Sequence, residues 1–153
     1  MAQIVLGAVA FGKPKPTTRD HPLAGDDACE ALLSAFKAHG GAELDTARVY
    51  QNGNCEEMLG RLPSADGLRI ATKYHPTGMP GSLTEQLDQS LAALRRDWVD
   101  IFYPHMPSTT IDLEHTLEEM NECFLAGKFK EFGLSNVSVV RPKLPRPTST
   151  NSV

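Results

Sequence analysis

The sequence predicts an α/β protein in which parallel strands alternate with helices. Five short apolar segments recur along the chain, and each of the first four is followed by a segment with helical spacing of its apolar residues. The apolar segments do not alternate cleanly with polar residues, which is typical of parallel strands buried on both faces. The 153 residues are enough for one such domain with a real core.

The predicted elements follow one another in strict β/α order. The strands are rich in aliphatic and aromatic residues and cover 4–11, 42–47, 68–74, 99–105 and 129–135. The helices cover 26–39, 55–61, 82–96 and 111–126. This order fits two architectures, an open doubly wound sheet and a piece of a (β/α)8 barrel.

Local signals mark the ends of several helices. Asp26 or Asp27 can cap the first helix, and Gly127 is placed to end the last one. Ser82 is followed three residues later by Glu85, which predicts a capping box at the start of the third helix. Four leucines at helical spacing predict the buried face of that helix: Leu83, Leu87, Leu91 and Leu94.

Composition excludes several classes of function. A net charge of −4 argues against a nucleic-acid partner or an anionic membrane, which both favour clustered Lys and Arg. The longest apolar runs have the length of strands, so we expect no membrane span. The three cysteines are widely spaced and odd in number, which favours reduced thiols in the cytoplasm. No Cys or His pair has zinc-ligand spacing, so we expect no metal.

Residues 7–13 do not form a phosphate-binding loop, although they match part of its pattern. Residues 7–13 fit the pattern G-x-x-x-x-G-K, but Pro14 stands where a phosphate-binding loop needs Ser or Thr, and no good helix start follows. A G-x-G-x-x-G fingerprint is also missing, which argues against a dinucleotide-binding doubly wound sheet.

Polar side chains stand at or just after the ends of four predicted strands. Asp45 ends the second strand with Tyr50 just beyond it, Lys73 lies near the end of the third, His105 ends the fourth, and Ser135-Asn136 follows the fifth. Because parallel strands place their carboxyl ends at one rim, we expect these side chains to meet there.

These residue types form a coherent set for proton delivery. A phenol has an ordinary pKa of about 10, and a nearby ammonium lowers it by stabilising the phenolate. A carboxylate holds the ammonium in place, and an imidazole can orient a substrate carbonyl. The set predicts a site that protonates a carbonyl group while that group accepts a hydride.

The chain resembles the aldo-keto reductases over residues 4–136. The similar segments are GAVAFG, LDTARVYQNG with EEMLG, RIATKY, WVDIFYPHMP and GKFKEFGLSN, in the order and near the spacing of that family. The branch with aflatoxin-aldehyde reductases is the most similar. The resemblance implies a partial (β/α)8 TIM barrel with about five β/α units, and NADPH-dependent reduction of an aldehyde or ketone to an alcohol.

The resemblance also implies a role for each residue at the rim. Tyr50 would donate the proton, and Lys73 would lower its pKa. Asp45 would pair with Lys73 and lie near the nicotinamide ribose, while His105 would bind and orient the substrate carbonyl. The last pair would bind the nicotinamide carboxamide: Ser135 and Asn136.

The chain has fewer strands than a complete barrel, which has eight. The family's late loops, which hold the phosphate end of NADPH, are not among its segments, so we expect weak cofactor binding. Unpaired edges of the first and fifth strands favour association with a second copy or another chain. A catalytically inactive half-barrel is therefore the alternative to an active reductase.

The composition changes after residue 136. Residues 137–153 are rich in Pro, Ser and Thr, and we expect a disordered or loosely packed tail after a domain at 1–136. A last extended segment that docks on the domain is the alternative. A shifted reading frame or an unremoved intron would produce such an abrupt change of composition.

Overall fold

The computed structural model describes residues 4–12, 25–108 and 112–136. Its core is one five-stranded sheet of β1 (Val5–Gly7), β2 (Glu43–Asp45), β3 (Arg69–Tyr74), β4 (Val99–Pro104) and β5 (Phe129–Phe132). The α-helices between the strands are α1 (Asp26–Ala38), α2 (Asn54–Leu59), α3 (Leu83–Leu94) and α4 (Leu113–Leu125). Two short 3-10 turns are η1 (Tyr50–Gly53) and η2 (Pro63–Ala65). The expected tail at 137–153 lies outside the described residues.

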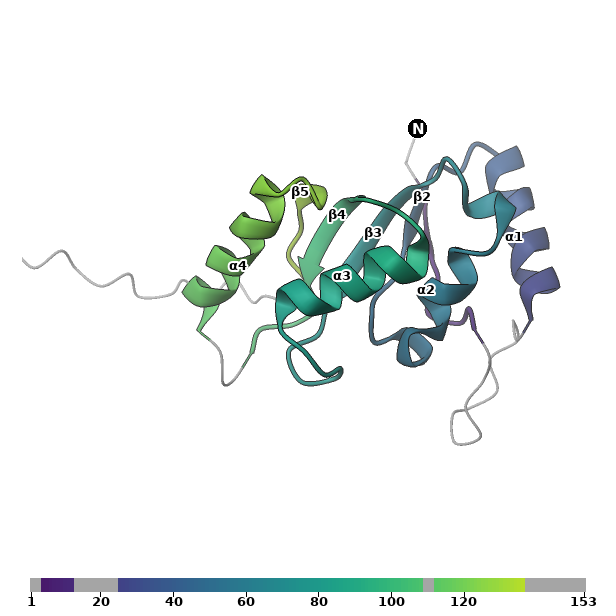
Figure 1. Cartoon of the computed structure of the whole chain (residues 1–153). Helices are drawn as coiled ribbons and strands as arrows, with labels where there is room; N and C mark the ends of the chain where they lie inside the picture. The colour runs from purple at the N-terminus through teal and green to yellow at the C-terminus, as the bar shows by residue number, and fades with distance from the viewer. Residues whose placement is uncertain (1–3, 13–24, 109–111, 137–153) are drawn as a thin grey trace, which may run out of the picture.

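The order of the strands decides between the two predicted architectures. Every strand pairs in parallel with the next one along the chain, in the order β1-β2-β3-β4-β5. A doubly wound sheet reverses its strand order at a switch point, and this sheet does not. The helices cover one face of the sheet and curve around it (Figure 1). The fold is therefore a partial β/α barrel, as the sequence predicts.

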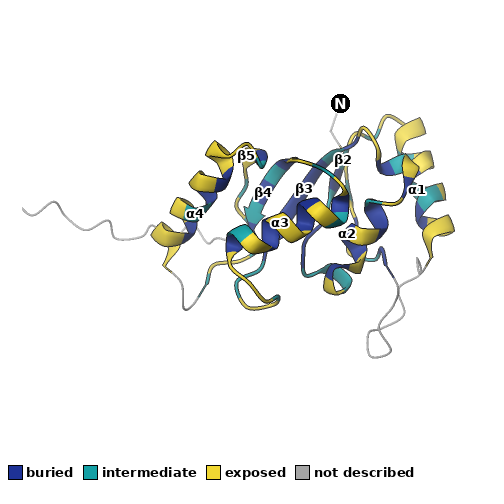
Figure 2. Ribbon diagram, viewed as in Figure 1, coloured by how far each residue is buried: buried dark blue, intermediate teal, exposed yellow. Residues whose placement is uncertain are grey.

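The hydrophobic core lies between the sheet and the helices. Leu44, Ile70 and Phe102 point from three neighbouring strands into this layer and are almost completely buried. The helices present their buried stripes to the same layer, with exposed residues on the outside (Figure 2). Burial of each such side chain contributes roughly 2 kcal/mol, so this layer is the main source of stability.

The opposite face of the sheet carries charged side chains. Arg69 begins β3, and its guanidinium contacts three carboxylates near the amino ends of the strands. Its Nε is 3.1 Å from Glu43, one terminal nitrogen is 2.9 Å from Glu131, and the other is 3.8 Å from Asp100. No helix among the described residues covers this face, and Arg69 keeps 39% of its side chain exposed.

The strands are shorter than the sequence predicts. The first strand ends at Gly7 because the chain turns at once, with the Phe11 N–H donating to the carbonyl of Ala8. β2 has only three residues, which limits the ladder available to β1. The predicted Asp26 or Asp27 cap on α1 is wrong: Gly25 is the N-cap residue, and no side chain caps it.

The start of α3 confirms the predicted capping box. The Ser82 hydroxyl accepts from the Glu85 N–H at 3.2 Å, and the Glu85 carboxylate accepts from the Ser82 N–H at 2.8 Å. Two helix-end donors are thus satisfied by one pair of side chains. All four leucines of the predicted stripe are buried: Leu83, Leu87, Leu91 and Leu94.

We expect Ser82→Ala to lower the free energy of unfolding by about 1 kcal/mol, because it leaves the Glu85 N–H without its acceptor. Urea unfolding followed by circular dichroism measures this change. Gln89→Ala is the control, since Gln89 is an exposed residue of the same helix. Equal stability of the Ser82 variant and the wild-type chain would show that the cap contributes nothing.

Candidate active site

The fold brings the four predicted catalytic side chains together at the carboxyl edge of the sheet. Asp45 ends β2, Tyr50 begins η1, Lys73 is the fifth residue of β3, and His105 directly follows β4. The parallel ladders set this arrangement, because they align the ends of β2, β3 and β4. The expectation that these residues meet at one rim is therefore confirmed.

Lys73 and Asp45 form an ion pair inside the rim. The Lys73 Nζ donates to Asp45 Oδ2 at 2.6 Å and to the backbone carbonyl of Thr46 at 2.7 Å. The lysine is only 7% exposed, whereas the Asp45 side chain keeps 31% of its surface exposed. Burial lowers the pKa of Lys73, and the hydrogen bond and charge of Asp45 oppose that shift. The carboxylate thus keeps a buried ammonium charged.

Tyr50 lies between the lysine and the histidine. The Lys73 Nζ is 5.2 Å from the centre of its ring, and the His105 ring meets it edge-on with 5.7 Å between ring centres. The pKa of Tyr50 is raised, first by burial and then by the charge of Asp45. In the resting site, burial and the Asp45 charge outweigh any lowering of this pKa by Lys73, whose effect on the phenol stays a prediction. The phenol is therefore protonated at neutral pH.

His105 presents a neutral ring to the site. Burial lowers its pKa, and the charges of Lys73 and His75 lower it further, against the opposite effect of Asp45. Within the described residues, its Nδ1 is buried without a hydrogen-bond partner. A neutral imidazole can donate one N–H to a carbonyl oxygen, so His105 fits the orienting role implied by the resemblance.

A second imidazole, His75, flanks this ring, although the sequence pointed to no role for it. The rings of His75 and His105 lie 5.3 Å apart at 65°. The His75 Nδ1 accepts from the Gly78 N–H at 2.7 Å, which leaves Nε2 as the nitrogen that carries the proton when the ring is neutral. Gln86 holds the backbone at this point: its Oε1 accepts from the His75 N–H at 3.1 Å, and its Nε2 donates to the His75 carbonyl at 3.1 Å.

Sequence reasoning missed the role of Gln86, which is completely buried. Its Nε2 also donates to the carbonyls of Met79 and Gly81, so one carboxamide organises the whole loop between β3 and α3. A signal was present: Gln86 interrupts the leucine stripe of α3 at a position that faces the core. A polar side chain at such a position needs buried partners.

The pair after β5 lies beside His105. The Asn136 Nδ2 donates to the backbone carbonyl of His105 at 2.7 Å and to the Ser135 hydroxyl at 3.0 Å. Asn136 adopts a left-handed backbone conformation, with φ at 57°, which Asn tolerates better than most residues. The structure thus brings this pair to the same rim, and its role toward a cofactor stays a prediction.

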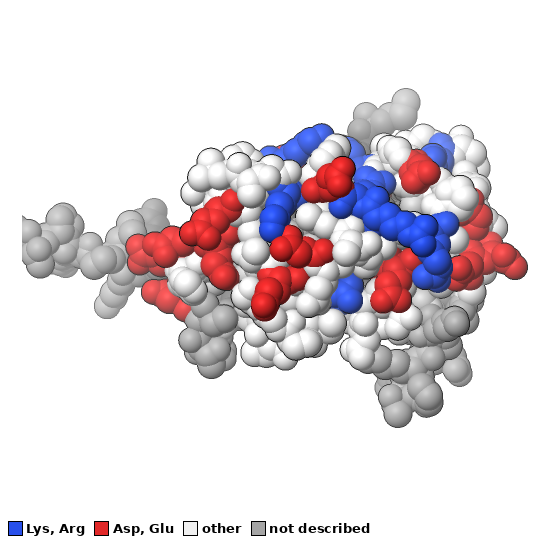
Figure 3. Space-filling view, viewed as in Figure 1, with Lys and Arg blue, Asp and Glu red and all other residues white. Residues whose placement is uncertain are grey.

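Several other expectations bear on the chemistry of the site. All three cysteines are free and buried. In the described ranges no group of three His, Cys, Asp or Glu side chains could hold a metal ion, and no helix there is long and apolar enough to cross a membrane. Lys and Arg gather near the C-terminal ends of α2 and α3, whereas acidic side chains crowd α4 (Figure 3). The absence of a nucleic-acid partner stays a prediction.

A rim of Tyr, Lys, Asp and His on parallel β/α units defines a candidate site for carbonyl chemistry. The sequence profile of the aldo/keto reductase family matches residues 3–142. The chain belongs to this family, as the resemblance predicted.

Individual relatives agree with this assignment. The chain is 37% identical over 141 residues to human aflatoxin B1 aldehyde reductase member 4. It is 33% identical over 142 residues to the oxidoreductase sirO of Leptosphaeria maculans. Among solved structures, an aldo/keto reductase of Klebsiella pneumoniae in complex with NADP and acetate superposes with a TM-score of 0.73 at 25% identity.

The matches cover most of this chain but less than half of each relative. They include 86% of this chain and 40% of the human enzyme, 88% and 42% for the fungal enzyme, and 88% and 46% for the Klebsiella structure. The similarity is therefore to part of a longer barrel.

We expect His105 to titrate below the ordinary histidine pKa, and Lys73→Met to move its midpoint upward, since the lysine charge is one cause of the low value. Proton NMR of the imidazole carbons measures both midpoints, with His105→Asn to assign the signal among the five histidines. The pKa of His105 is lower in the folded state than in the unfolded chain. The free energy of unfolding should therefore decrease as the pH falls through the ordinary histidine pKa. A midpoint unchanged by the lysine substitution would contradict this electrostatic account.

Proposed function

We propose that this site performs the NADPH-dependent reduction of an aldehyde or ketone to an alcohol, with Tyr50 as the proton donor. The observation that carries the proposal is the position of the Tyr50 ring, held between the Lys73 ammonium and the His105 imidazole. A substrate carbonyl oxygen at this point would meet a phenol O–H and an imidazole N–H.

The raised pKa of Tyr50 supports the role of acid in the resting site. A phenol that stays protonated at neutral pH has a proton to give when negative charge develops on the carbonyl oxygen. After the transfer, the nearby Lys73 charge favours the phenolate that remains. Asp45 keeps that charge in place through its 2.6 Å bond.

The residues present fit the nicotinamide end of the cofactor. The Asp45 carboxylate is part-exposed and uses Oδ2 for Lys73, so a ribose hydroxyl could donate to it. The Asn136 side chain uses its N–H groups on His105 and Ser135, and its carbonyl can accept from a carboxamide. When bound, NADPH supplies the hydride that reduces the carbonyl carbon.

The relatives support a substrate class for this proposal. The human relative is an aflatoxin B1 aldehyde reductase by name, and the Klebsiella relative binds NADP in its structure. We propose a xenobiotic or secondary-metabolite carbonyl compound as the substrate of this chain.

A second candidate is a half-barrel that acts through association with another chain. The outer edges of β1 and β5 carry no further strand within the described residues, and exposed edges pair readily. The chain spans about two fifths of the length of the human relative, which leaves this sheet open where a barrel would close.

The reductase proposal is tested first by NADPH binding and then by turnover of a model aldehyde. We expect Tyr50→Phe to retain the fluorescence change on NADPH binding and to lose at least ~100-fold in turnover, because only the acid is removed. Tyr103→Phe is the matched control, since that ring also lies 5.8 Å from the Lys73 Nζ.

Two results would contradict the proposal. Full turnover in Tyr50→Phe with loss in Tyr103→Phe would assign the proton to the other phenol. A folded wild-type chain that binds no NADPH at millimolar concentration would favour the second candidate.

The second candidate predicts an oligomer that depends on strand edges. The Ala8 N–H, just after β1, donates to the carbonyl of Asp45 in β2, so the Val5 N–H, three residues earlier, points away from β2. Val5→Pro should shift any dimer toward monomer without loss of fold, as sedimentation velocity measures. Leu125→Lys, on the exposed surface of α4, is the control. A dimer unaffected by proline would not use this edge.

A further inference from the structure

The mechanism above does not use the buried ion pair of Glu56 and Arg48. Glu56 on α2 is completely buried, and its carboxylate is shared between two partners. Its Oε2 accepts from an Arg48 terminal nitrogen at 2.7 Å, and its Oε1 accepts from the Thr72 hydroxyl at 2.6 Å. A buried ion pair is weak evidence for stability by itself, because desolvation offsets its Coulomb attraction. The role of this pair therefore lies in the segments that it holds in place.

The pair joins the two segments that carry the phenol and the ammonium. Arg48 precedes Tyr50 by two residues, and Thr72 directly precedes Lys73. The backbones of these segments also meet, since the Arg48 N–H donates to the Lys73 carbonyl at 3.2 Å. Glu56 thus completes a closed connection between the Tyr50 turn and β3.

The turn that Tyr50 begins has a strained backbone, although Asn54 Nδ2 donates to the Gln51 carbonyl at 3.2 Å within it. Gln51, Asn52 and Gly53 have φ values of 49°, 59° and 90°, which are three successive left-handed conformations. Such conformations are unfavourable for residues other than glycine and persist only where surrounding contacts impose them. Contacts from outside the turn are therefore needed to impose this conformation, and Gln51 Nε2 provides one by donating to the Val9 carbonyl at 3.2 Å.

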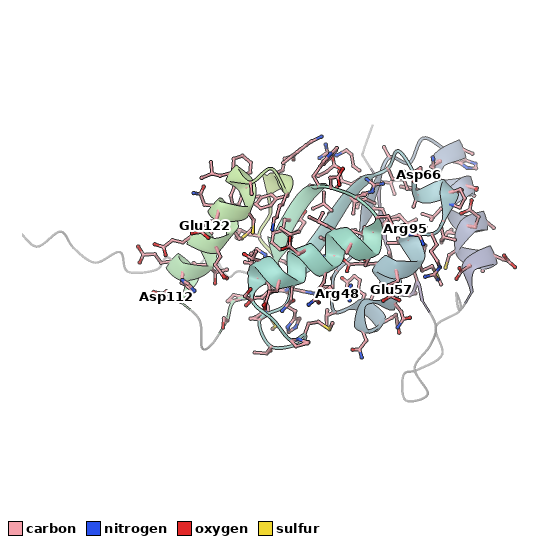
Figure 4. All side chains as sticks on the ribbon, viewed as in Figure 1. Arg48, Glu57, Asp66, Arg95, Asp112 and Glu122 are labelled. Carbon is pink, nitrogen blue, oxygen red and sulfur yellow. The ribbon has the colours of Figure 1, made fainter. Side chains whose placement is uncertain are left out.

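The Arg48 guanidinium contacts this turn at Gly53. A Cβ atom on Gly53 would lie 2.1 Å from an Arg48 terminal nitrogen, so the guanidinium fills the space that a side chain there would need. Arg48 is 9% exposed and lies beside α2 in the interior of the molecule (Figure 4). The Arg48 guanidinium therefore packs against the last residue of the turn, and its ion pair with Glu56 fixes the position of the guanidinium.

We propose that Arg48 and Glu56 are positioning residues, which hold the Tyr50 ring at its place between Lys73 and His105. In this role they act through Tyr50 and not on the substrate or the cofactor. The catalytic meaning of this role rests on the proposed function, whereas the placement of the ring can be measured without turnover.

The test uses NMR of the full chain with labelled tyrosine, which gives signals for Tyr50, Tyr74 and Tyr103 only. Thr72→Val removes one bond to Glu56 without leaving a buried charge unpaired, and Glu56→Gln removes the carboxylate charge. We expect both variants to lose the cross-peaks between the Tyr50 and His105 rings and to shift the Tyr50 signals toward those of an unfolded chain. Tyr74 and Tyr103 lie on β3 and β4, and their signals should stay in place.

A further variant separates positioning from general stability. Arg48→Lys keeps the charge toward Glu56 and should retain more of the cross-peaks than Arg48→Met. Unchanged Tyr50–His105 cross-peaks in Thr72→Val would overturn the proposal, and so would an equal shift of all three tyrosines. If Glu56→Gln does not fold, Thr72→Val decides. The two proposals can fail separately. If Thr72→Val loses the ring contact but Tyr50→Phe still reduces aldehydes, the positioning role stands and only the proposed function is refuted.

Discussion

The parallel pairing of β2 with β3 is the contact on which the rest of the structure depends. It sets Asp45 beside the strand that carries Lys73, and it lets the loop after β2 continue along β3 through bonds from Thr46 and Arg48. The two strands also bury Leu44 against the helices. The same ladder thus aligns the ion pair of the site and anchors the hydrophobic layer, so the chemistry and the fold share one support.

Polar groups inside this molecule are arranged to fix geometry. The buried carboxamide of Gln86 organises the loop after β3, and the buried carboxylate of Glu56 joins the turn before α2 to the sheet. Each group is hydrogen-bonded to more than one segment, which removes alternatives for the backbone around the rim. In the described part of the chain, four buried side-chain atoms have no hydrogen-bond partner: Arg48 Nε, Gln51 Oε1, Ser90 Oγ and His105 Nδ1.

The sequence was sufficient to predict the order of elements and the residues at the rim. Apolar runs and the leucines after Ser82 depend on local periodicity, and the strand ends placed Asp45 and Lys73 because parallel ladders align them. The interrupted leucine stripe marked Gln86 as a buried polar residue but did not identify its partners, and no local pattern pointed to the links of Glu56. The upward shift of the Tyr50 pKa was not predicted, because it depends on how deeply the phenol is buried and on its distance from Asp45.

The charged face of the sheet has a consequence for any partner that covers it. Arg69 is surrounded by Glu43, Asp100 and Glu131, so three carboxylates and one guanidinium lie together near the amino ends of the strands. A second copy laid face to face would bring two such acidic layers together, and their repulsion is screened by salt. Closure by an identical chain should thus strengthen with ionic strength, whereas a partner that carries cationic side chains should bind most tightly in dilute buffer.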